Sequence, residues 1–318
     1  MKAQGKVTED ELIAAFSAVL CGPDSKKVVL GIGDDAAAWR PSRSHLSVIS
    51  TDALVEGIHF TTQGAAFDQI GYRALAANLS DIAAMGARPV LATIALGVPA
   101  GADPLDLVEI YRGVDRLARR AKIAIAGGDI VRSRDLFLSI TVVGEVRPGN
   151  LKRRSGARVD DVVAVTGELG ASRAALEGHD PAHTPVPRIA EGIWLGRSRN
   201  VHALMDISDG LSTDLARMAA ASHCGAILDE VPVAPSANAR ARSLGEDPRR
   251  YAAAAGEDFE LLAAVEPRVF SYLSARFAQR FGWPLLRIGT FRAGKGVALK
   301  DTGGEVPLEP SGWDHLAR

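Results

Sequence analysis

Apolar and polar positions along the first half of the chain predict helices and strands in alternation. Apolar residues at three- and four-residue spacing predict helices over 8–20, after a Thr-Glu-Asp cap signal, and over 67–85, before Gly86 and Pro89. A further helix is predicted near 104–121. Short runs rich in apolar and β-branched residues predict the strands of this half, over 46–51, 90–98 and 136–146.

The second half repeats this alternation after a polar segment. Residues 147–160, RPGNLKRRSGARVD, are polar, basic and glycine-bearing, and they predict a junction between two domains, 1–148 and 149–318. The elements expected beyond the junction are a strand over 161–167, a helix from 170, a strand over 203–208, a helix over 211–222, and strands over 260–265 and 285–291 separated by an amphipathic helix. The order predicts the fold class α/β (α+β), with two α/β units of similar size.

Composition narrows the possible function classes. With 318 residues, 47% of them hydrophobic, the chain has enough apolar surface for two cores. Its 37 basic and 38 acidic residues leave a formal net charge of −1, so no broad basic surface for nucleic acid is indicated. Cys21 and Cys224 show no CxxC spacing and are expected to be reduced and buried. Without a signal-peptide segment or a long apolar run, we expect a cytoplasmic protein that contacts no membrane.

Aspartates beside glycines at the ends of apolar runs are the most distinctive feature of the sequence. Carboxylates in such places project into clefts, and several together bind hard cations that bridge to phosphate oxygens. Taken singly, an Asp-Gly pair is more often a turn or a helix cap, as Asp209 before Gly210 illustrates. Together they favour a metal and phosphate site, and the segments are GIGDDAA (31–37), STDALVEGIHF (50–60), NLSDIAAMGA (78–87), GGDIVRS (127–133), DISDGL (206–211) and GEDFEL (256–261).

The familiar nucleotide-binding loops are absent from the sequence. Residues 289–295 spell GTFRAGK, but Gly296 follows and VALK predicts a strand, where a P-loop opens a helix. The GIG at 31–33 lacks the third glycine of a dinucleotide loop. A phosphate-transferring enzyme without a P-loop lysine must neutralise triphosphate charge mainly with metal ions, which agrees with the abundance of aspartate.

The order of these motifs resembles bacterial thiamine-monophosphate kinases, in the superfamily typified by aminoimidazole ribonucleotide synthetase. The likeness runs from GIGDDAA through the other aspartate segments and RRSGA to the terminal SGWDHL, so it covers nearly the whole chain. It implies an N-terminal domain that binds metal and ATP and pairs across a homodimer, and a C-terminal domain that closes the cleft. It also implies several Mg²⁺ ions, ATP as co-substrate, and in-line γ-phosphoryl transfer to thiamine monophosphate in thiamine diphosphate biosynthesis.

The resemblance further implies a role for individual residues. The metal ligands it implies are Asp34, Asp35, Ser50, Thr51, Asp52, Asp81, Asp129, Asp206 and Asp209, of which Asp52, Asp129 and Asp209 are the catalytic candidates. The ATP contacts it implies are Tyr111, Gly128, Asp129, Arg154 and Ser208, and the substrate contacts are His59, Glu257 and Trp313. Three of these have ordinary alternatives: His59 as a core histidine, Arg154 as a linker charge, and Trp313 as a packing anchor.

Two segments depart from the pattern of the family. Ile130 and Val131 stand where many relatives carry threonine, and Phe259 stands where tyrosine is common, so hydroxyls are lost while the carboxylates remain. Two rival functions stay open at this point. The first is another ATP-using member of the superfamily, although Cys21 lacks the reactive-cysteine motif of a selenophosphate synthetase. The second is a non-catalytic nucleotide- or metal-binding regulator.

Overall fold

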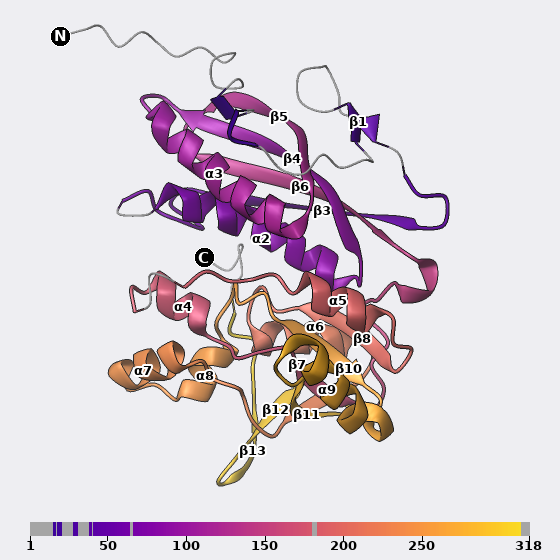
Figure 1. Cartoon of the computed structure of the whole chain (residues 1–318). Coiled ribbons are helices and arrows are strands. Elements are labelled where there is room, and N and C mark those ends of the chain that lie inside the picture. The colour runs from indigo at the N-terminus through magenta and orange to yellow at the C-terminus, as the bar shows by residue number, and fades with distance from the viewer. Residues whose placement is uncertain are drawn as a thin grey trace, which may run out of the picture. The chain divides into compact units, whose positions relative to one another are not determined.

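The structure, a computed structural model, divides the chain into two compact units (Figure 1). It describes residues 15–16, 18–20, 28–30, 38–39, 41–63, 66–179 and 183–312. Unit 1 comprises Met1–Ile82 and Arg88–Glu145, and unit 2 comprises Ala83–Ala87 and Val146–Arg318. Each unit has its own sheet and its own helices.

Unit 1 is built on a four-stranded sheet in the order β3-β6-β4-β5. Strand β4 pairs in parallel with β5 and antiparallel with β6. The short strands β1 and β2 pair with each other. The elements of this half are β1 (Val28–Leu30), β2 (Ala38–Trp39), β3 (Leu46–Val55), α2 (Phe67–Ala84), β4 (Arg88–Pro99), α3 (Pro104–Ala121), β5 (Ala124–Ser133) and β6 (Phe137–Val146).

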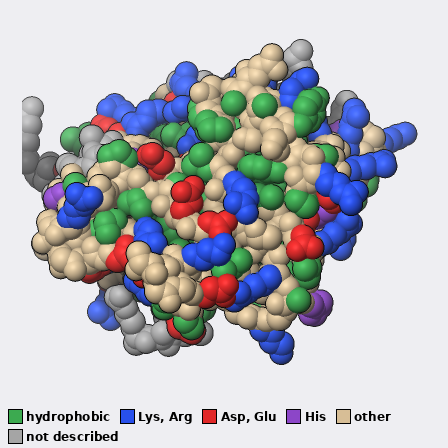
Figure 2. Space-filling view, turned by 90° about the horizontal axis from the view of Figure 1, so that it is seen from below, with side chains coloured by type: hydrophobic (Ala, Val, Ile, Leu, Met, Phe, Trp, Pro, Cys, Tyr) green, Lys and Arg blue, Asp and Glu red, His purple; other side chains and the backbone are tan. Residues whose placement is uncertain are grey.

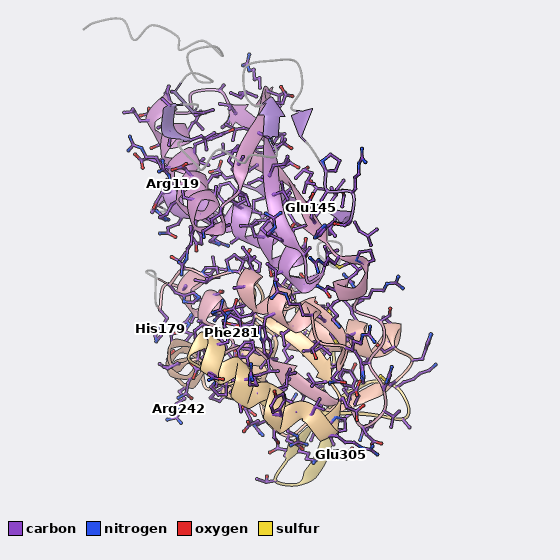
Figure 3. All side chains as sticks on the ribbon, turned by 45° about the vertical axis from the view of Figure 1, so that its right-hand side comes forward. Arg119, Glu145, His179, Arg242, Phe281 and Glu305 are labelled. Carbon is purple, nitrogen blue, oxygen red and sulfur yellow. The ribbon has the colours of Figure 1, made fainter. Side chains whose placement is uncertain are left out.

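Helices α2 and α3 lie side by side in unit 1 (Figure 1). Glycines permit their close approach, because a Cβ at Gly71 would stand 1.9 Å from the carbonyl oxygen of Ile110, and one at Gly113 would stand 1.7 Å from that of Asp68. Helix α3 matches the predicted range 104–121. It starts at Pro104 after Asp103, whose side chain accepts the Leu105 N–H, and its cap Lys122 has left-handed backbone. Arg119, labelled in Figure 3, lies in its last turn, where a cation complements the helix dipole.

The unit 1 sheet has one buried face and one open face. Ile94 and Leu96 of β4 pair with Ile140 and Leu138 of β6, and all four are fully buried. The residues between them point to the opposite face, because side chains alternate along a strand. That face carries exposed apolar side chains, of which Ile49 on β3 is 67% exposed and Val131 on β5 is 42% exposed.

Unit 2 is built on a seven-stranded sheet in the order β13-β12-β9-β11-β7-β10-β8. Only the β9–β12 pair is parallel among the pairs of this sheet that the structure describes. The elements are the 3₁₀ turn η1 (Pro148–Asn150), β7 (Val162–Val165), α4 (Ala171–Leu176), α5 (Ile189–Gly196), β8 (Val201–Asp206), α6 (Leu211–Ala221), β9 (Gly225–Leu228), α7 (Pro235–Leu244), α8 (Pro248–Ala253), β10 (Leu261–Val265), α9 (Pro267–Phe281), β11 (Leu286–Arg292), β12 (Val297–Asp301) and β13 (Gly304–Pro307).

Both faces of the unit 2 sheet are covered, and the core is correspondingly divided in two. Val163 and Val165 of β7 pack into one cluster with α6, while Val162 and Ala164 pack into the other with α9. Aromatic rings close the second cluster. The ring of Phe281, which is labelled in Figure 3, packs on the ring of Phe277, one turn earlier in α9, with the ring centroids 4.6 Å apart. Two units of mixed sheet and helix confirm the predicted fold class α/β (α+β).

Several predictions made from the sequence can be compared with the described residues. β12 follows residues 289–295, which confirms that GTFRAGK is no P-loop. Cys224 is free and buried, whereas Cys21 and most of the helix predicted over 8–20 lie outside the described residues. No helix in the described part of the chain is long and apolar enough to cross a membrane. On the face shown in Figure 2, acidic and basic side chains are interspersed, in line with the formal net charge of −1.

The strand that carries Asp129 was missed by the sequence analysis, as were the short strands β1, β2, β9 and β13. Residues 124–133 form β5, so Asp129 lies inside a strand and not in a glycine turn at its end. β3 likewise continues to Val55, which places Asp52 within a strand instead of just after one. Adjacent Gly127 and Gly128 weaken the β signal locally, and only the pairing with β4 makes this segment a strand.

Candidate functional site

The first group of acidic oxygens in unit 1 gathers on the helix side of β3. The Ser50 hydroxyl donates a hydrogen bond to Oδ2 of Asp81, which α2 carries. Asp52 lies two residues further along β3 and therefore points to the same side as Ser50. Near Asp81 on α2, the polar residues Asn78 and Ser80 are fully buried. The structure thus brings Ser50, Asp52 and Asp81 to one side of β3.

A second group lies on the open face of the same sheet. The Thr141 hydroxyl donates to Oγ1 of Thr51 at 3.1 Å, so Thr51 points away from Ser50 and Asp52. Asp129 pairs with Ala95, two residues after Thr93, which pairs with Thr141. Thr51 and Asp129 therefore share the open face, on the strands β3 and β5 that flank the sheet.

Gly128, an expected ATP contact, has a packing reason of its own. A Cβ at this position would stand 1.9 Å from the carbonyl oxygen of Ile94 on β4. Any side chain there would push the two strands apart, because the atom it meets belongs to the backbone of β4 and cannot rotate away. Glycine at 128 thus keeps the backbone beside Asp129 in place and leaves it uncovered.

His59 lies in a tight turn directly after β3. Gly57 has φ +80° and donates its N–H to the Phe60 carbonyl at 2.8 Å. The N–H of Val55 donates to Nδ1 of His59 at 3.1 Å, so the neutral ring carries its proton on Nε2. His59 is only partly buried, so it is not enclosed in the core, and its contact with the substrate stays a prediction. Its Nε2–H group is the donor that an anionic ligand would use.

Tyr111 is a core residue in the structure. It is 5% exposed and stacks on Phe16, with ring centroids 3.9 Å apart and an interplanar angle of 6°. Burial raises the pKa of the Tyr111 hydroxyl above its ordinary range, which keeps that group protonated. One ring face is thus occupied by packing, and a nucleoside contact by Tyr111 stays a prediction.

In unit 2, a fully buried aspartate shapes the loop DISDG after β8. Oδ2 of Asp214, on the first turn of α6, accepts the N–H groups of Ser208 at 3.1 Å, Asp209 at 3.0 Å and Gly210 at 3.1 Å. These three N–H groups therefore have their hydrogen-bond partner within the protein. An acid in the first turn that reaches back to the preceding loop is the sequence signal for this role, and the sequence analysis overlooked it.

Arg217 links the two aspartates of this loop. It donates to Asp209 and, at 3.0 Å, to Oδ1 of Asp214. The pKa of Asp214 is raised to about 6, mainly by burial and also by the negative charge of Asp209, while Arg217 and the loop N–H groups act in the opposite direction. Arg217 therefore offsets part of the negative charge that Asp209 contributes, and it is another residue that the sequence analysis missed.

The GEDFEL segment runs beside the DISDG loop. Glu257 donates its N–H to the Ser208 carbonyl at 2.8 Å, and Phe259 donates to the Ile207 carbonyl at 3.0 Å. The expected substrate residue Glu257 thus lies next to the expected ATP residue Ser208. Glu257 at φ +62° and Phe259 at φ +53° are both in left-handed backbone, an uncommon and costly state for residues other than glycine.

Two buried acids hold this strained segment. Asp258 accepts the N–H groups of Gly170 at 2.6 Å and Ser172 at 3.1 Å, while the Ser172 hydroxyl donates to the Glu257 carbonyl at 2.8 Å. Burial raises the pKa of Asp258 to about 7. Glu260 accepts from Arg188 and, at 2.5 Å, from the Thr166 hydroxyl. Because Asp258 and Glu260 are both anchored, the segment that contains Glu257 and Phe259 is kept in its strained conformation.

The remaining predicted residues differ in what the structure says of them. Arg154 is exposed on the loop 153–160, and its carbonyl accepts from Ser222 at 3.4 Å, so the loop is held by its backbone. Asp206 is 6% exposed at the end of β8. Asp34, Asp35 and Trp313 lie outside the described residues.

The donor atoms fit a magnesium ion. In unit 1, hydroxyl and carboxylate oxygens of Ser50 and Asp81 already touch, with Asp52 on the same side of β3. Unit 2 has carboxylates of its own, Asp206 at the end of β8 and Asp209 in the loop after it. An all-oxygen set of this kind suits hard Mg²⁺ and offers nothing to a thiolate- or imidazole-seeking metal.

Comparison with known families assigns both halves of the chain. Residues 33–146 match the family described as AIR synthase related protein, N-terminal domain. Residues 158–299 match AIR synthase related protein, C-terminal domain. Together the two matches cover most of the chain and leave out only the junction and the two ends.

Individual proteins give a finer comparison. The chain is 38% identical over 273 residues, 83% of each chain, to a thiamine-monophosphate kinase of Rhodopirellula baltica. A thiamine-monophosphate kinase structure from Stenotrophomonas maltophilia is 33% identical, with a TM-score of 0.79 over 94% of this chain and 95% of that one. AaThiL complexed with AMPPCP and TMP is 29% identical, with a TM-score of 0.74 over 97% of both chains.

Proposed function

The chain belongs to the thiamine-monophosphate kinase family, and from this we propose that it transfers the γ-phosphoryl group of ATP to thiamine monophosphate. The products are thiamine diphosphate and ADP, in the biosynthesis of thiamine diphosphate. The observation that carries the proposal is the likeness over 97% of the chain to a relative complexed with AMPPCP, an ATP analogue, and TMP. The protein is thus an ATP-dependent phosphotransferase whose acceptor is a phosphate group.

Magnesium is the metal that the donor set supports. When bound, Mg²⁺ neutralises charge on the donor and acceptor phosphates. In this proposal Ser50, Asp52 and Asp81 hold metal on the helix side of β3, and Asp206 and Asp209 are the metal ligands in unit 2. The proposed metal ligands also include Thr51 and Asp129, on the open face of the sheet, and Asp34 and Asp35.

The other site residues position the two substrates. Gly128, Arg154, Ser208 and Tyr111 are the proposed contacts of ATP. His59, Glu257 and Trp313 are the proposed contacts of thiamine monophosphate: the Nε2–H of His59 suits a phosphate oxygen, and the carboxylate of Glu257 suits a cationic or amino-bearing ring. Because the acceptor phosphate is already anionic near neutral pH, alignment and charge neutralisation suffice and no strong general base is needed.

The two halves of the chain have different roles in the proposed reaction. Residues 1–148 bind metal and ATP, and residues 149–318 close the nucleotide and substrate cleft. The open face of the unit 1 sheet supports a homodimer, because a second copy would cover Ile49 and Val131 there. We place this enzyme of cofactor biosynthesis in the cytoplasm, with neither nucleic acid nor a membrane as partner.

Product analysis tests the proposal directly. Purified protein is mixed with ATP, Mg²⁺ and thiamine monophosphate, with thiamine and an aminoimidazole precursor as parallel acceptors. We expect thiamine diphosphate and ADP in equal amounts, and neither after chelation. If the folded protein binds ATP with Mg²⁺ but releases no ADP with any acceptor, the chain is a nucleotide-binding regulator instead. Turnover of the aminoimidazole precursor alone would assign it to another activity of the superfamily.

A further inference from the structure

A mixed group of metal-ligating side chains lies in unit 2, away from the residues described above. Asp161 immediately precedes β7, Glu266 immediately follows β10, and His202 is near the start of β8. These three strands are neighbours in the order β7-β10-β8 (Figure 1). Because β10 runs antiparallel to both others, all three residues reach the same end of the sheet. One ligand atom from each lies within 4.8 Å of the other two.

A β-bulge turns His202 toward the group. On β10, Ala264 pairs with Ala203 while the next residue, Val265, pairs with Val201, so His202 has no partner across the ladder. A bulged residue leaves the regular alternation, and its side chain is redirected. His202 therefore reaches Asp161 across β10, and its Nδ1 lies 3.0 Å and 2.9 Å from the two carboxylate oxygens.

The three side chains differ in what else they touch. The side chains of His202 and Asp161 are 7% and 2% exposed, and Asp161 also accepts the Arg158 N–H at 2.8 Å. Glu266 is the N-cap of α9 but makes no side-chain cap hydrogen bond. Within the part of the chain that the structure describes, no hydrogen bond or ion pair reaches its carboxylate. Glu266 is thus oriented by its place between β10 and α9 without a partner that uses its charge.

The charges of the group do not balance without a further cation. Two carboxylates carry more negative charge than one imidazole can offset, and the side chains of His202 and Asp161 are almost fully buried. Uncompensated charge in such a place is unfavourable. A divalent cation bound by a neutral imidazole and both carboxylates would bring the sum to zero.

We propose that Asp161, His202 and Glu266 form a second metal site, specific for a divalent transition ion such as Zn²⁺ or Co²⁺. The imidazole nitrogen separates this site from the all-oxygen magnesium set, since imidazole suits Zn²⁺ and Co²⁺ and hard Mg²⁺ prefers oxygen. Three protein ligands leave a position for water. Ligand atoms in a tetrahedral site with bonds of about 2 Å are about 3.3 Å apart, so the three side chains would draw closer together around the ion.

The place of the site suggests a structural role. The loop 153–160, which carries Arg154, leads directly into Asp161, and the Gly156 backbone packs on the His202 carbonyl. An ion here ties the end of that loop to two strands of the sheet. Metal should therefore raise the thermal stability of the whole chain, and this expectation does not depend on the proposed kinase activity.

Titration of the full-length protein tests the site. Chelated protein is titrated with Co²⁺ in saturating Mg²⁺, which fills the oxygen-only positions, and cobalt absorption together with X-ray absorption reports imidazole ligation. We expect one equivalent of tightly bound Co²⁺ with one imidazole. The variants His202→Gln and Glu266→Gln should bind about tenfold or more weaker, while matched exposed controls, His223→Gln and Glu230→Gln, bind as wild type does.

Two further measurements distinguish a metal site at His202 from metal bound elsewhere in the chain. Melting of each metal-free variant checks its fold, and Co²⁺ should raise the melting temperature of the wild type but not of His202→Gln. The variant His59→Gln must keep the imidazole signal, because its loss there would place the ion at the candidate functional site. Unchanged Co²⁺ binding in His202→Gln, or no binding by the wild type, would overturn the proposal and leave a buried His–Asp ion pair.

Discussion

At the scale of residues, two buried aspartates that are not among the proposed ligand-binding residues hold the loops of the candidate site in place. Asp214 and Asp258 are buried, accept backbone N–H groups, and hold the loops that carry Asp209 and Glu257. Asp209 is one of the residues expected to bind metal, and Glu257 is one of those expected to bind the substrate. A carboxylate that accepts several backbone N–H bonds defines a loop better than any single turn residue, because one rigid group fixes several peptide units.

Asp258 predicts a measurable pH dependence of stability. Its pKa in the folded protein is raised to about 7 from 3.8, so the folded state binds more protons than the unfolded state between these values. Its contribution is therefore fully present below pH 3.8 and is lost as the pH rises through about 7. Urea unfolding of the wild type and Asp258→Asn between pH 5 and pH 8 should show a flatter dependence for the variant. Equal slopes would remove Asp258 as the cause.

Asp129 predicts a loss of activity without a loss of stability. It is exposed on the open face of the sheet, so Asp129→Asn should change the free energy of unfolding by no more than about 0.5 kcal/mol. Loss of one charge-stabilising group should lower kcat by about 100-fold or more. The exposed Asp135→Asn, in the turn after β5, is the matched control and should keep full kcat. Full kcat in Asp129→Asn would take this residue out of the proposed metal set.

At the scale of elements, the packing of α2 against α3 decides where Asp81 lies. The two helices touch backbone to backbone at Gly71 and Gly113, and α2 brings Asp81 to the Ser50 hydroxyl on β3. The distance between helix axes is therefore part of the site geometry. A shift of α2 by a fraction of an ångström would separate the oxygens that the metal must join.

Gly113→Ala tests this dependence. The added methyl would stand 1.7 Å from the Asp68 carbonyl oxygen, so the helices must move apart at a cost of about 1–3 kcal/mol. We expect a lower unfolding free energy and a higher Mg²⁺ requirement for turnover. Gly149→Ala, where nothing lies within 4 Å of the new Cβ, is the control. An unchanged Mg²⁺ requirement in a destabilised Gly113→Ala would show that α2 does not position the ligands.

At the scale of the whole molecule, the open sheet face and the two-unit organisation bear on assembly. Ile49 and Val131 are exposed on strands that carry the candidate residues Thr51 and Asp129. Exposed apolar side chains on a sheet face become more favourable when a partner covers them. A second copy on this face would therefore bury them close to the proposed site.

A charge on this face should disrupt the homodimer. Ile49→Lys places an ammonium group on the covered surface, and its desolvation opposes association. Analytical ultracentrifugation should show a dimer for the wild type and a monomer for Ile49→Lys. Leu105→Lys is the control, because Leu105 is 72% exposed at the start of α3 and not on the open face. A monomeric wild type, or a dimeric Ile49→Lys, would contradict this assembly.

Much of the fold and part of the site follow from local patterns. Helix α3 was predicted with its observed bounds because its periodicity, its Asp103 cap and Pro104 all act within a few residues. The family could be predicted because its motifs keep their order along nearly the whole chain. Strand β5 was missed because its identity comes from β4, about thirty residues earlier, and not from its own glycine-rich sequence.

The sequence by itself determined the two-unit fold class, the family and the oxygen-rich chemistry, because periodicity, caps and motif order are local properties of the chain. Only the tertiary structure decided that Ser50 faces Asp81 while Thr51 and Asp129 occupy the other side of the sheet. It also decided that Asp258 reaches Gly170, 88 residues away in the sequence. Such pairings depend on strand register and burial, which bring together residues that no local pattern relates.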